Sequence, residues 1–156
     1  MLTEFIRPES IKIPLESPSL SPVTKEAVIA ELVALLPEAA ETARRDAILK
    51  AVLLRERQMS TGIGNGVAIP HGSADIDAHL SLAAGVAPAP GVHYAAIDRQ
   101  PARIFFLLVA RPGERTPYLQ ALAYIARLMK NEAIHQRLLD APSAAVFYEV
   151  LRSAEP

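Results

Sequence analysis

Apolar residues recur at helical spacing in the first third of the chain. Val28, Leu32 and Leu35 lie on one helical face, and Pro37 ends the run. Thr24 precedes them, and threonine is a residue type that caps helix N-termini because its hydroxyl accepts a bond from a free backbone N–H. The pattern predicts a first helix that begins after Thr24 and ends before Pro37.

A second helical pattern spans roughly residues 43–57 and carries one anomaly. Ile48 and Val52 are spaced as on one buried face, and the next position of that face holds Arg55. An arginine there can extend its aliphatic stem toward water and interact favourably with the C-terminal helix dipole. The alternative is that its guanidinium faces a functional site.

Three strands are predicted in the middle of the chain. Val67–Ile69 is a short apolar run, and longer runs follow at Leu80–Ala87 and Arg103–Ala110. The continuous apolar stretch Ile104–Val109 is typical of a strand that is buried on both faces.

Helical patterns return in the last third. Thr116 is predicted to cap a helix that has Pro117 at its first position. The apolar face of this helix consists of Tyr118, Leu122, Ile125 and Met129. Asn131 and Ser143 are predicted to cap two more helices, the last of which ends near Arg152.

The arrangement of these elements predicts the fold class. Residues 1–22 are rich in proline and serine, which predicts an extended N-terminal segment with one short strand at Ile11–Leu15. Strands in the middle with helices before and after them indicate an α/β fold. We expect residues 1–156 to form a single domain, a layered sandwich whose mixed central sheet is flanked by helices on both sides.

Composition narrows the function classes. The net charge of −1 argues against a broad nucleic-acid-binding surface, which needs an excess of Lys and Arg. The absence of cysteine excludes disulfides and thiolate chemistry. No apolar run reaches about 18 residues and no signal peptide is present, so we expect no membrane insertion and a cytoplasmic location.

His71 is the main candidate for chemistry. A glycine-rich stretch precedes it, in which Asn65-Gly66 favours a type I′ hairpin turn. Pro70 stiffens the chain before His71, and Gly72 leaves room for a bulky ligand beside the imidazole. A lone histidine in a loop is more often an ordinary surface residue, but this stiff surrounding of small residues favours a functional one.

Other chemistries fit the pattern less well. The glycine spacing matches neither the G-x-G-x-x-G fingerprint nor a P-loop, although the backbone N–H groups of the turn could hold an anion. Ser60 is not in a G-x-S-x-G elbow, which disfavours a hydrolase. We predict no metal site, because no standard zinc spacing relates the nearby His71, Asp75, Asp77 and His79.

The segment Thr61–Gly72, with the sequence TGIGNGVAIPHG, closely resembles the phosphohistidine signature of type 2 enzyme IIA domains of the bacterial phosphotransferase system (PTS). This is the fructose, mannitol and nitrogen-regulatory family. The resemblance covers most of the chain, including Arg55–Arg57 at the end of the second helix and the strand at Ile104–Val109. It implies a phosphocarrier, an enzyme that takes a phosphoryl group on a histidine and passes it on.

By this resemblance, His71 is the phosphorylated histidine and Arg55 is the arginine near the phosphoryl group. The family usually carries a second active-site histidine where this chain has Tyr118. Tyrosine can donate a hydrogen bond but stays neutral at pH 7, which implies slower onward transfer or a mainly regulatory protein. The resemblance assigns the phosphate pocket to Thr61, Gly62, Asn65, Gly66 and Tyr118.

The resemblance also implies partners. The donor is phospho-HPr or its nitrogen-branch paralogue, and the acceptor is an enzyme IIB (EIIB) domain or a regulated protein. No metal or nucleotide cofactor is implied, because the donor is a phosphoprotein. The chain carries no IIB or membrane IIC segment, which predicts a stand-alone carrier or regulator. Docking needs an exposed apolar rim around His71, for which Ile63, Val67 and Val92 are the candidates.

Two other functions remain open at this point. The first is a non-catalytic binding module with a IIA-like fold that controls a transporter or a kinase. The second is a small-ligand domain that binds an anion in the glycine turn.

Overall fold

The computed structural model describes residues 2–19 and 23–156. The strands are β1 (Ile11–Lys12), β2 (Gly62–Gly64), β3 (Val67–Ala68), β4 (His71–Ser73), β5 (Leu80–Val86) and β6 (Ile104–Ala110). The α-helices are α1 (Lys25–Val33), α2 (Thr42–Gln58), α3 (Arg115–Leu128), α4 (Glu132–Leu139) and α5 (Ala144–Ala154). Short 3-10 helices lie at Leu2–Glu4, Pro8–Ser10, Ser17–Ser19 and Pro37–Ala40.

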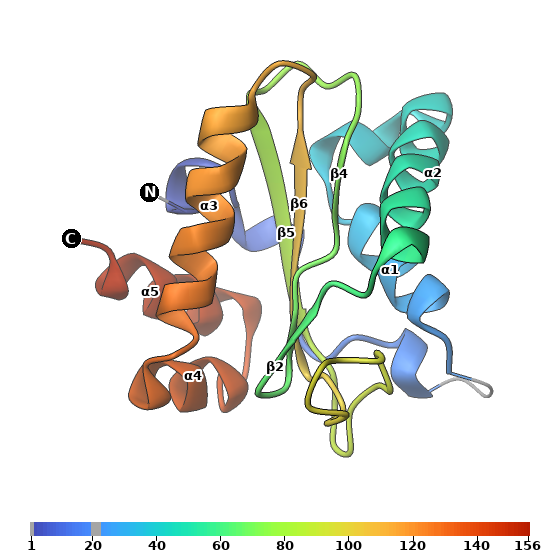
Figure 1. Ribbon diagram of the computed structural model, residues 1–156. Helices are drawn as coiled ribbons and strands as arrows, with labels where there is room; N and C mark the ends of the chain where they lie inside the picture. Colours follow the sequence, from blue (N-terminus) through green and yellow to red (C-terminus); the bar gives the residue numbers. More distant parts are fainter. Residues whose placement is uncertain (1, 20–22) are drawn as a thin grey trace.

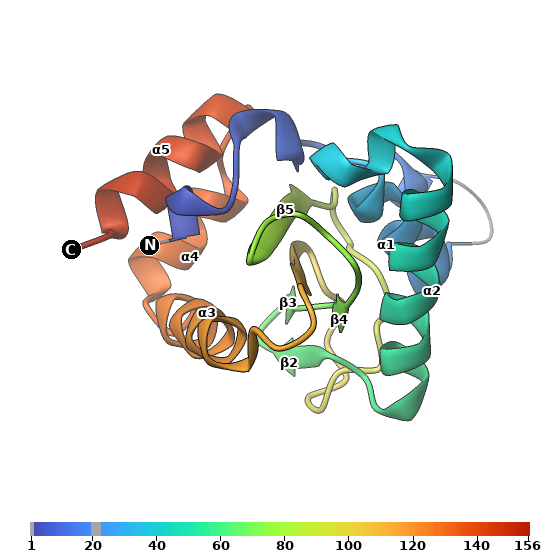
Figure 2. The ribbon, with the colours of Figure 1, turned by 90° about the horizontal axis from the view of Figure 1, so that it is seen from above.

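The strands form one mixed sheet between two layers of helices (Figures 1 and 2). Its order is β1–β5–β6–β3–β2, and β4 also pairs with β6. The helices α1 and α2 lie on one side, whereas α3, α4 and α5 lie on the other. The predicted α/β layered fold with a mixed sheet is therefore confirmed.

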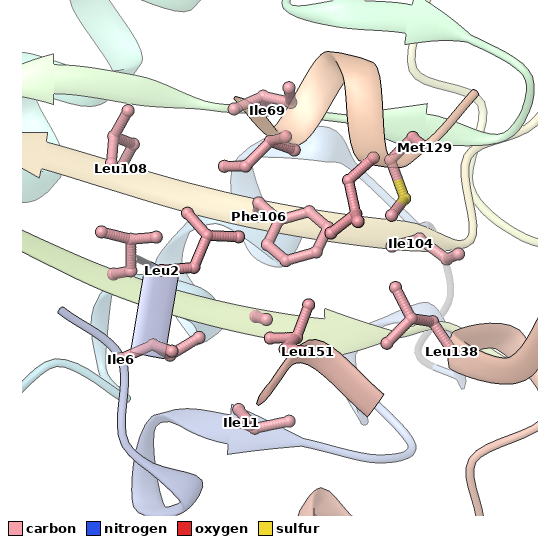
Figure 3. Packing of buried hydrophobic residues seen from close by; sticks show 14 of the residues in the cluster. Leu2, Ile6, Ile11, Ile69, Ile104, Phe106, Leu108, Met129, Leu138 and Leu151 are labelled. Atoms are coloured by element: carbon pink, nitrogen blue, oxygen red, sulfur yellow. The ribbon is translucent and has the colours of Figure 1, made fainter. Parts of the chain in front are cut away.

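The core has two parts because successive side chains of a strand point to opposite faces of the sheet. Every residue of β6 is buried, as its continuous apolar run predicts, and every residue of β5 is buried as well. Phe106 points toward α3–α5, where Met129, Leu138 and Leu151 surround it (Figure 3). Its neighbour Phe105 belongs to the part beneath α1 and α2.

Most of the helix starts predicted from capping residues agree with the structure. Thr24, Asn131 and Ser143 each accept, through the side-chain oxygen, a hydrogen bond from the backbone N–H three residues later, at 3.1, 3.2 and 3.3 Å. The predicted cap at Thr116 is wrong, because the backbone N–H of Tyr118 already bonds to the carbonyl of Glu114 at 3.3 Å. Within residues 2–19 and 23–156, no helix is long and apolar enough to cross a membrane.

The N-terminal segment is not simply extended, which corrects the prediction for residues 1–22. Three 3-10 helices bend it, the strand is limited to Ile11–Lys12, and residues 20–22 lie outside the described part. The bends bring Leu2 and Ile6 into the core, where each side chain is at most 2% exposed. Burial of these apolar side chains outweighs the preference of the segment for extended backbone.

The pairing of β3 and β4 with β6 decides which way His71 points. Both strands run parallel to β6, and His71 lies opposite Leu108. Leu108 belongs to the core part on the α3 side, so His71 shares that face, whereas Gly72 faces α2. A shift of one residue in this register would exchange the two faces.

Candidate functional site

A pocket of about 650 Å3 is lined by residues of the C-terminal half of α2, of the strand β4 and of the N-terminal end of α3. Arg55, His71 and Tyr118 line it together, although they come from three separate elements. The pocket thus unites three of the residues that the sequence singled out.

The hydrogen bonding of His71 determines which ring nitrogen is available for reaction. Its Nδ1 lies 2.7 Å from the backbone carbonyl oxygen of Ile69. A carbonyl oxygen only accepts hydrogen bonds, so Nδ1 carries the proton and donates it. In the neutral ring the lone pair is then on Nε2, which makes Nε2 the nucleophilic atom.

The surroundings of His71 favour this neutral form. Burial of the ring is the main cause that lowers the pKa of His71 below its ordinary value of 6.5. The positive charge of Arg55 lowers this pKa further, whereas the Ile69 carbonyl and the Glu56 carboxylate raise it. Because the net shift is downward, the imidazole is mostly unprotonated at pH 7 and can act as a nucleophile.

Arg55 lies in the last turn of α2. It is half-buried, and its Nη1 donates a hydrogen bond to the carbonyl oxygen of Met59 at 2.9 Å. This bond satisfies a carbonyl at the C-terminal end of the helix. Arg55 also lines the pocket, and its role in a functional site stays a prediction.

The electrostatic character of the pocket suits an anion. Arg111 and Arg115 line it together with Arg55, and Glu114 is the acidic residue among its lining side chains. Nη2 of Arg111 bonds to Oε1 of Glu114 at 2.9 Å, which offsets part of the positive charge. The N-terminus of α3 also borders the pocket and adds the positive end of a helix dipole.

The glycine turn lies outside this pocket, contrary to the assignment of phosphate contacts to it. Asn65 and Gly66 have φ of 56° and 73°, as the predicted two-residue hairpin turn requires. The backbone N–H of Asn65 donates to Oδ2 of Asp98 at 2.8 Å. A carboxylate of the protein therefore already occupies the place where an anion would bind, and Gly62 packs against Ala96 instead.

Thr61 is buried behind the pocket and does not line it. Its hydroxyl donates to Oε1 of Glu56 through a short hydrogen bond, and its N–H donates to Oε2 at 2.9 Å. The hydroxyl of Tyr94 donates to the same carboxylate at 2.7 Å. Thr61 is thus part of the support beneath the site rather than a contact to a ligand.

Sequence reasoning missed Glu56 in this network. One signal was available, because Glu56 stands four residues after Val52 and eight after Ile48, on the same buried face of α2. Arg111 and Arg115 were missed as well, and only the tertiary structure brings them to the pocket. No sequence pattern points to Tyr94, since it lies in a loop rich in proline and glycine, where no helical or strand periodicity applies.

The apolar rim differs from the sequence-based expectation. Val67 and Val92 are both 1% exposed and cannot meet a partner, whereas Ile63 is 43% exposed. Leu54, which lines the pocket, is 57% exposed, and Leu119, next to Tyr118, is 47% exposed. The exposed apolar side chains at the pocket therefore come from the two helices that flank it.

Two of the other candidate metal ligands near the site pair with charged groups. Asp77 accepts from Arg44 at 3.1 Å, and Nδ1 of His79 lies 2.7 Å from Glu114. Among the residues that the structure describes, no three His, Asp or Glu side chains converge in a way that could hold a metal ion.

Comparison with known protein families gives a match over nearly the whole chain. Residues 4–154 match the family described as phosphoenolpyruvate-dependent sugar phosphotransferase system, EIIA 2. The fructose-specific EIIABC component of Bacillus subtilis is 35% identical over 150 residues, which are 96% of this chain but only 23% of that protein.

Two other relatives are similar over their own length too. The fructose-specific EIIA component of Haloferax volcanii is 34% identical over 140 residues, 88% of this chain and 90% of that protein. A nitrogen regulatory protein of Bradyrhizobium diazoefficiens is 33% identical over 151 residues, 96% of this chain and 94% of that protein.

Solved structures show the same fold. The nitrogen regulatory protein IIA-Ntr of Neisseria meningitidis superposes with a TM-score of 0.81 at 23% identity, covering 96% of this chain and 98% of that one. Escherichia coli IIA mannitol gives a TM-score of 0.70 at 22% identity, with 94% and 98% covered. A complex of enzyme IIA mannitol with phosphorylated enzyme IIB mannitol from E. coli gives a TM-score of 0.69 at 20% identity, with 95% and 97% covered.

Proposed function

Since this chain belongs to the EIIA 2 family of the phosphoenolpyruvate-dependent sugar phosphotransferase system, whose members carry phosphoryl groups between components of that system, we propose that His71 is its phosphorylated residue. The donor would be phospho-HPr or its nitrogen-branch paralogue. The acceptor would be an EIIB domain, or the phosphoryl group would serve as a regulatory signal.

The observation that carries the proposal is the hydrogen bonding of the His71 ring, which leaves one nitrogen free to react. Its Nδ1 is held by the Ile69 carbonyl, so Nε2 bears the lone pair in a pocket lined by three arginines. A nucleophile beside fixed positive charge is the arrangement that phosphoryl acceptance needs, because this reaction depends mostly on positioning and on electrostatic stabilisation.

The proposed step is an in-line displacement at phosphorus. The Nε2 lone pair of His71 forms a bond to phosphorus while the bond between phosphorus and the donor histidine nitrogen breaks. The electron pair of the broken bond stays on the donor imidazole, which leaves neutral or takes up a proton from solvent. The proton on Nδ1 of His71 stays in its bond to Ile69 throughout.

Each positive group has a role in this step. The planar guanidinium of Arg55 can bind two phosphoryl oxygens at once. Arg111, Arg115 and the N-terminus of α3 border the other side of the pocket, where the remaining negative charge would lie. Tyr118 would cover the imidazole and can donate a hydrogen bond.

Partner docking would use the helices beside the pocket. The exposed side chains of Leu54 on α2 and Leu119 on α3 flank it and offer apolar surface to a donor or an acceptor. One solved neighbour with this fold is bound to phosphorylated enzyme IIB mannitol, which supports an EIIB-type acceptor for this chain as part of the proposal.

A second candidate function is regulation by binding without turnover. Relatives named nitrogen regulatory proteins favour it, since one of them matches 96% of this chain. The neutral Tyr118 in the pocket is compatible with it too. The two candidates differ in whether His71 accepts a phosphoryl group.

The test is intact-mass analysis after incubation with phosphoenolpyruvate, enzyme I and HPr or its nitrogen-branch paralogue. We expect a gain of one phosphoryl group that is lost in acid and is absent from His71→Ala. His135→Ala is the matched control, because this histidine is partly buried on α4 and bonds to the carbonyl of Asn65 instead. Absence of any gain with either donor would favour the binding module.

A further inference from the structure

A buried carboxylate lies behind the phosphoryl pocket. Glu56 on α2 is only 6% exposed, yet it lies in the polypeptide next to Arg55, which reaches the pocket. It accepts hydrogen bonds from the hydroxyl and the N–H of Thr61 and from the hydroxyl of Tyr94. The ammonium of Lys25 on α1 lies 3.3 Å from its Oε2.

These donors keep Glu56 ionised. Burial alone would raise the pKa of this carboxyl, but the hydrogen bonds from Thr61 and Tyr94 and the charge of Lys25 outweigh burial, and the pKa lies below its ordinary value. The carboxylate is therefore a fixed acceptor that holds Thr61 at both its side chain and its backbone.

Thr61 connects this carboxylate to His71. The carbonyl oxygen of Thr61 accepts the N–H of Ile69 at 3.0 Å. The carbonyl oxygen of Ile69 in turn accepts Nδ1–H of His71 at 2.7 Å. Hydrogen bonds thus run without a gap from Glu56 through Thr61 and Ile69 to the imidazole.

We propose that Glu56 is a positioning residue for phosphoryl acceptance, which fixes the tautomer and the orientation of His71 through Thr61 and Ile69. The inference rests on the proposed function, in which His71 is the phosphoryl acceptor. Its effect is to keep the lone pair on Nε2, because only an Ile69 carbonyl held in place can keep the proton on Nδ1.

Stability alone does not account for a carboxylate at this place. Replacement of buried ion pairs by well-packed apolar residues is often neutral or stabilising, so a methionine on this face of α2 would serve packing as well. What an apolar residue cannot do is accept two directed hydrogen bonds from one residue. The carboxylate supplies that directionality, and the residue it holds is the one that holds Ile69.

The proposal predicts different results for two changes of Glu56. Glu56→Gln can keep its carbonyl oxygen on the N–H of Thr61 and turn its NH2 toward the hydroxyls, so the tautomer of His71 should stay as in the wild type. Glu56→Met has similar volume and no such acceptor. It should let the imidazole mix both tautomers and should slow phosphorylation by about tenfold, the effect of one lost hydrogen bond.

The control is Tyr94→Phe, which removes a donor to Glu56 but leaves both bonds between Glu56 and Thr61 in place. It should lower thermal stability and leave the tautomer of His71 unchanged. A role of Glu56 in stability alone predicts instead that Tyr94→Phe and Glu56→Met behave alike.

The experiment measures 15N chemical shifts of the His71 ring in the unphosphorylated protein, together with the single-turnover phosphorylation rate and circular dichroism. Mixed tautomers in folded Glu56→Met, with the wild-type tautomer in Tyr94→Phe, are the expected result. An unchanged tautomer and rate in folded Glu56→Met would overturn the proposal. If that variant does not fold, Thr61→Val takes its place and must change the tautomer in the same direction.

The tautomer is measured without any donor protein, so this result is separate from the proposed function. If wild-type His71 carries its proton on Nδ1 and never accepts a phosphoryl group, the proposed function fails while the hydrogen-bond chain stands. If His71 is phosphorylated equally fast in the wild type and in folded Glu56→Met, the function stands and the positioning role fails.

Discussion

The ring of Tyr118 meets the imidazole of His71 edge to face, with ring centroids 5.5 Å apart and an angle of 60° between the planes. The first turn of α3 brings the tyrosine there and β4 brings the histidine. Burial raises the pKa of Tyr118 above its ordinary value, against the opposing charge of Arg55, so the phenol is neutral at pH 7. Tyr118 therefore shields the nucleophile without adding positive charge beside it.

Removal of this ring should change the titration of His71. Burial is the main cause of the lowered pKa of His71. Tyr118→Ala should therefore raise the pKa of His71 toward 6.5, because it admits water to the imidazole. The neutral fraction at a given pH near 6 then falls, and the pH profile of phosphoryl acceptance moves to higher pH. NMR titration of the imidazole measures the pKa, and stopped reactions at several pH values measure the rate.

Tyr118→Phe is the matched control for that variant. It keeps the ring and removes only the hydroxyl, so the pKa of His71 should stay near the wild-type value. An equal shift in the Ala and Phe variants would show that shielding by the ring does not set the pKa.

Arg55→Ala should slow phosphorylation strongly. Charge-assisted hydrogen bonds contribute about 1.5–3 kcal/mol, which corresponds to a loss of about ten- to a hundredfold in rate. Because the charge of Arg55 lowers the pKa of His71, the same variant should raise that pKa. Arg55→Lys keeps the charge but not the bidentate geometry. Its phosphorylation rate should lie between those of the wild type and Arg55→Ala.

Arg57→Ala serves as the comparison, since Arg57 is exposed two residues further along α2. Single-turnover rates from intact mass should be unchanged for it. A similar loss for both arginines would point to the overall charge of α2 rather than to the contact of Arg55 with the pocket.

Gly72→Ala should destabilise the protein and disturb the site. A Cβ on Gly72 would lie 3.2 Å from the backbone N and Cα of Val52, so β4 and α2 would have to move apart. Such overpacking costs about 1–3 kcal/mol of unfolding free energy, measurable by urea denaturation. Ser73→Ala at the exposed neighbouring position should stay within about 0.5 kcal/mol of the wild type.

Removal of a tyrosine hydroxyl should have opposite effects at two buried positions. The hydroxyl of Tyr124 is buried without a hydrogen-bond partner among the described residues, whereas that of Tyr94 donates to Glu56 at 2.7 Å. Tyr124→Phe should therefore keep or increase the unfolding free energy, because an unsatisfied buried hydroxyl costs about 1–3 kcal/mol. Tyr94→Phe should lower it by about 1.5–3 kcal/mol, since it weakens a bond to a charged group.

Thermal and urea denaturation of both variants test this contrast. A decrease for Tyr124→Phe as large as that for Tyr94→Phe would mean that the ring hydroxyl of Tyr124 has a partner in solution, such as an ordered water molecule.

The sequence by itself determined the α-helices and the strands β3, β5 and β6, along with two chemical groups of the site. Caps at Thr24, Asn131 and Ser143 and the hairpin turn at Asn65-Gly66 follow from local hydrogen bonding and allowed dihedral angles, which neighbouring residues decide. Local spacing also brought out Arg55 as a cation on an apolar face, and the glycine-rich signature singled out His71.

Only the tertiary structure decided what lies around His71. The register of β4 against β6 turns the imidazole toward Tyr118. The loop after β6 brings Arg111, and the start of α3 brings Arg115, to the same pocket. The glycine turn, adjacent in sequence, instead binds Asp98. The physical reason is that local sequence decides which residues share a face of one element, whereas pairing between distant strands and helices decides where that face points and what it meets.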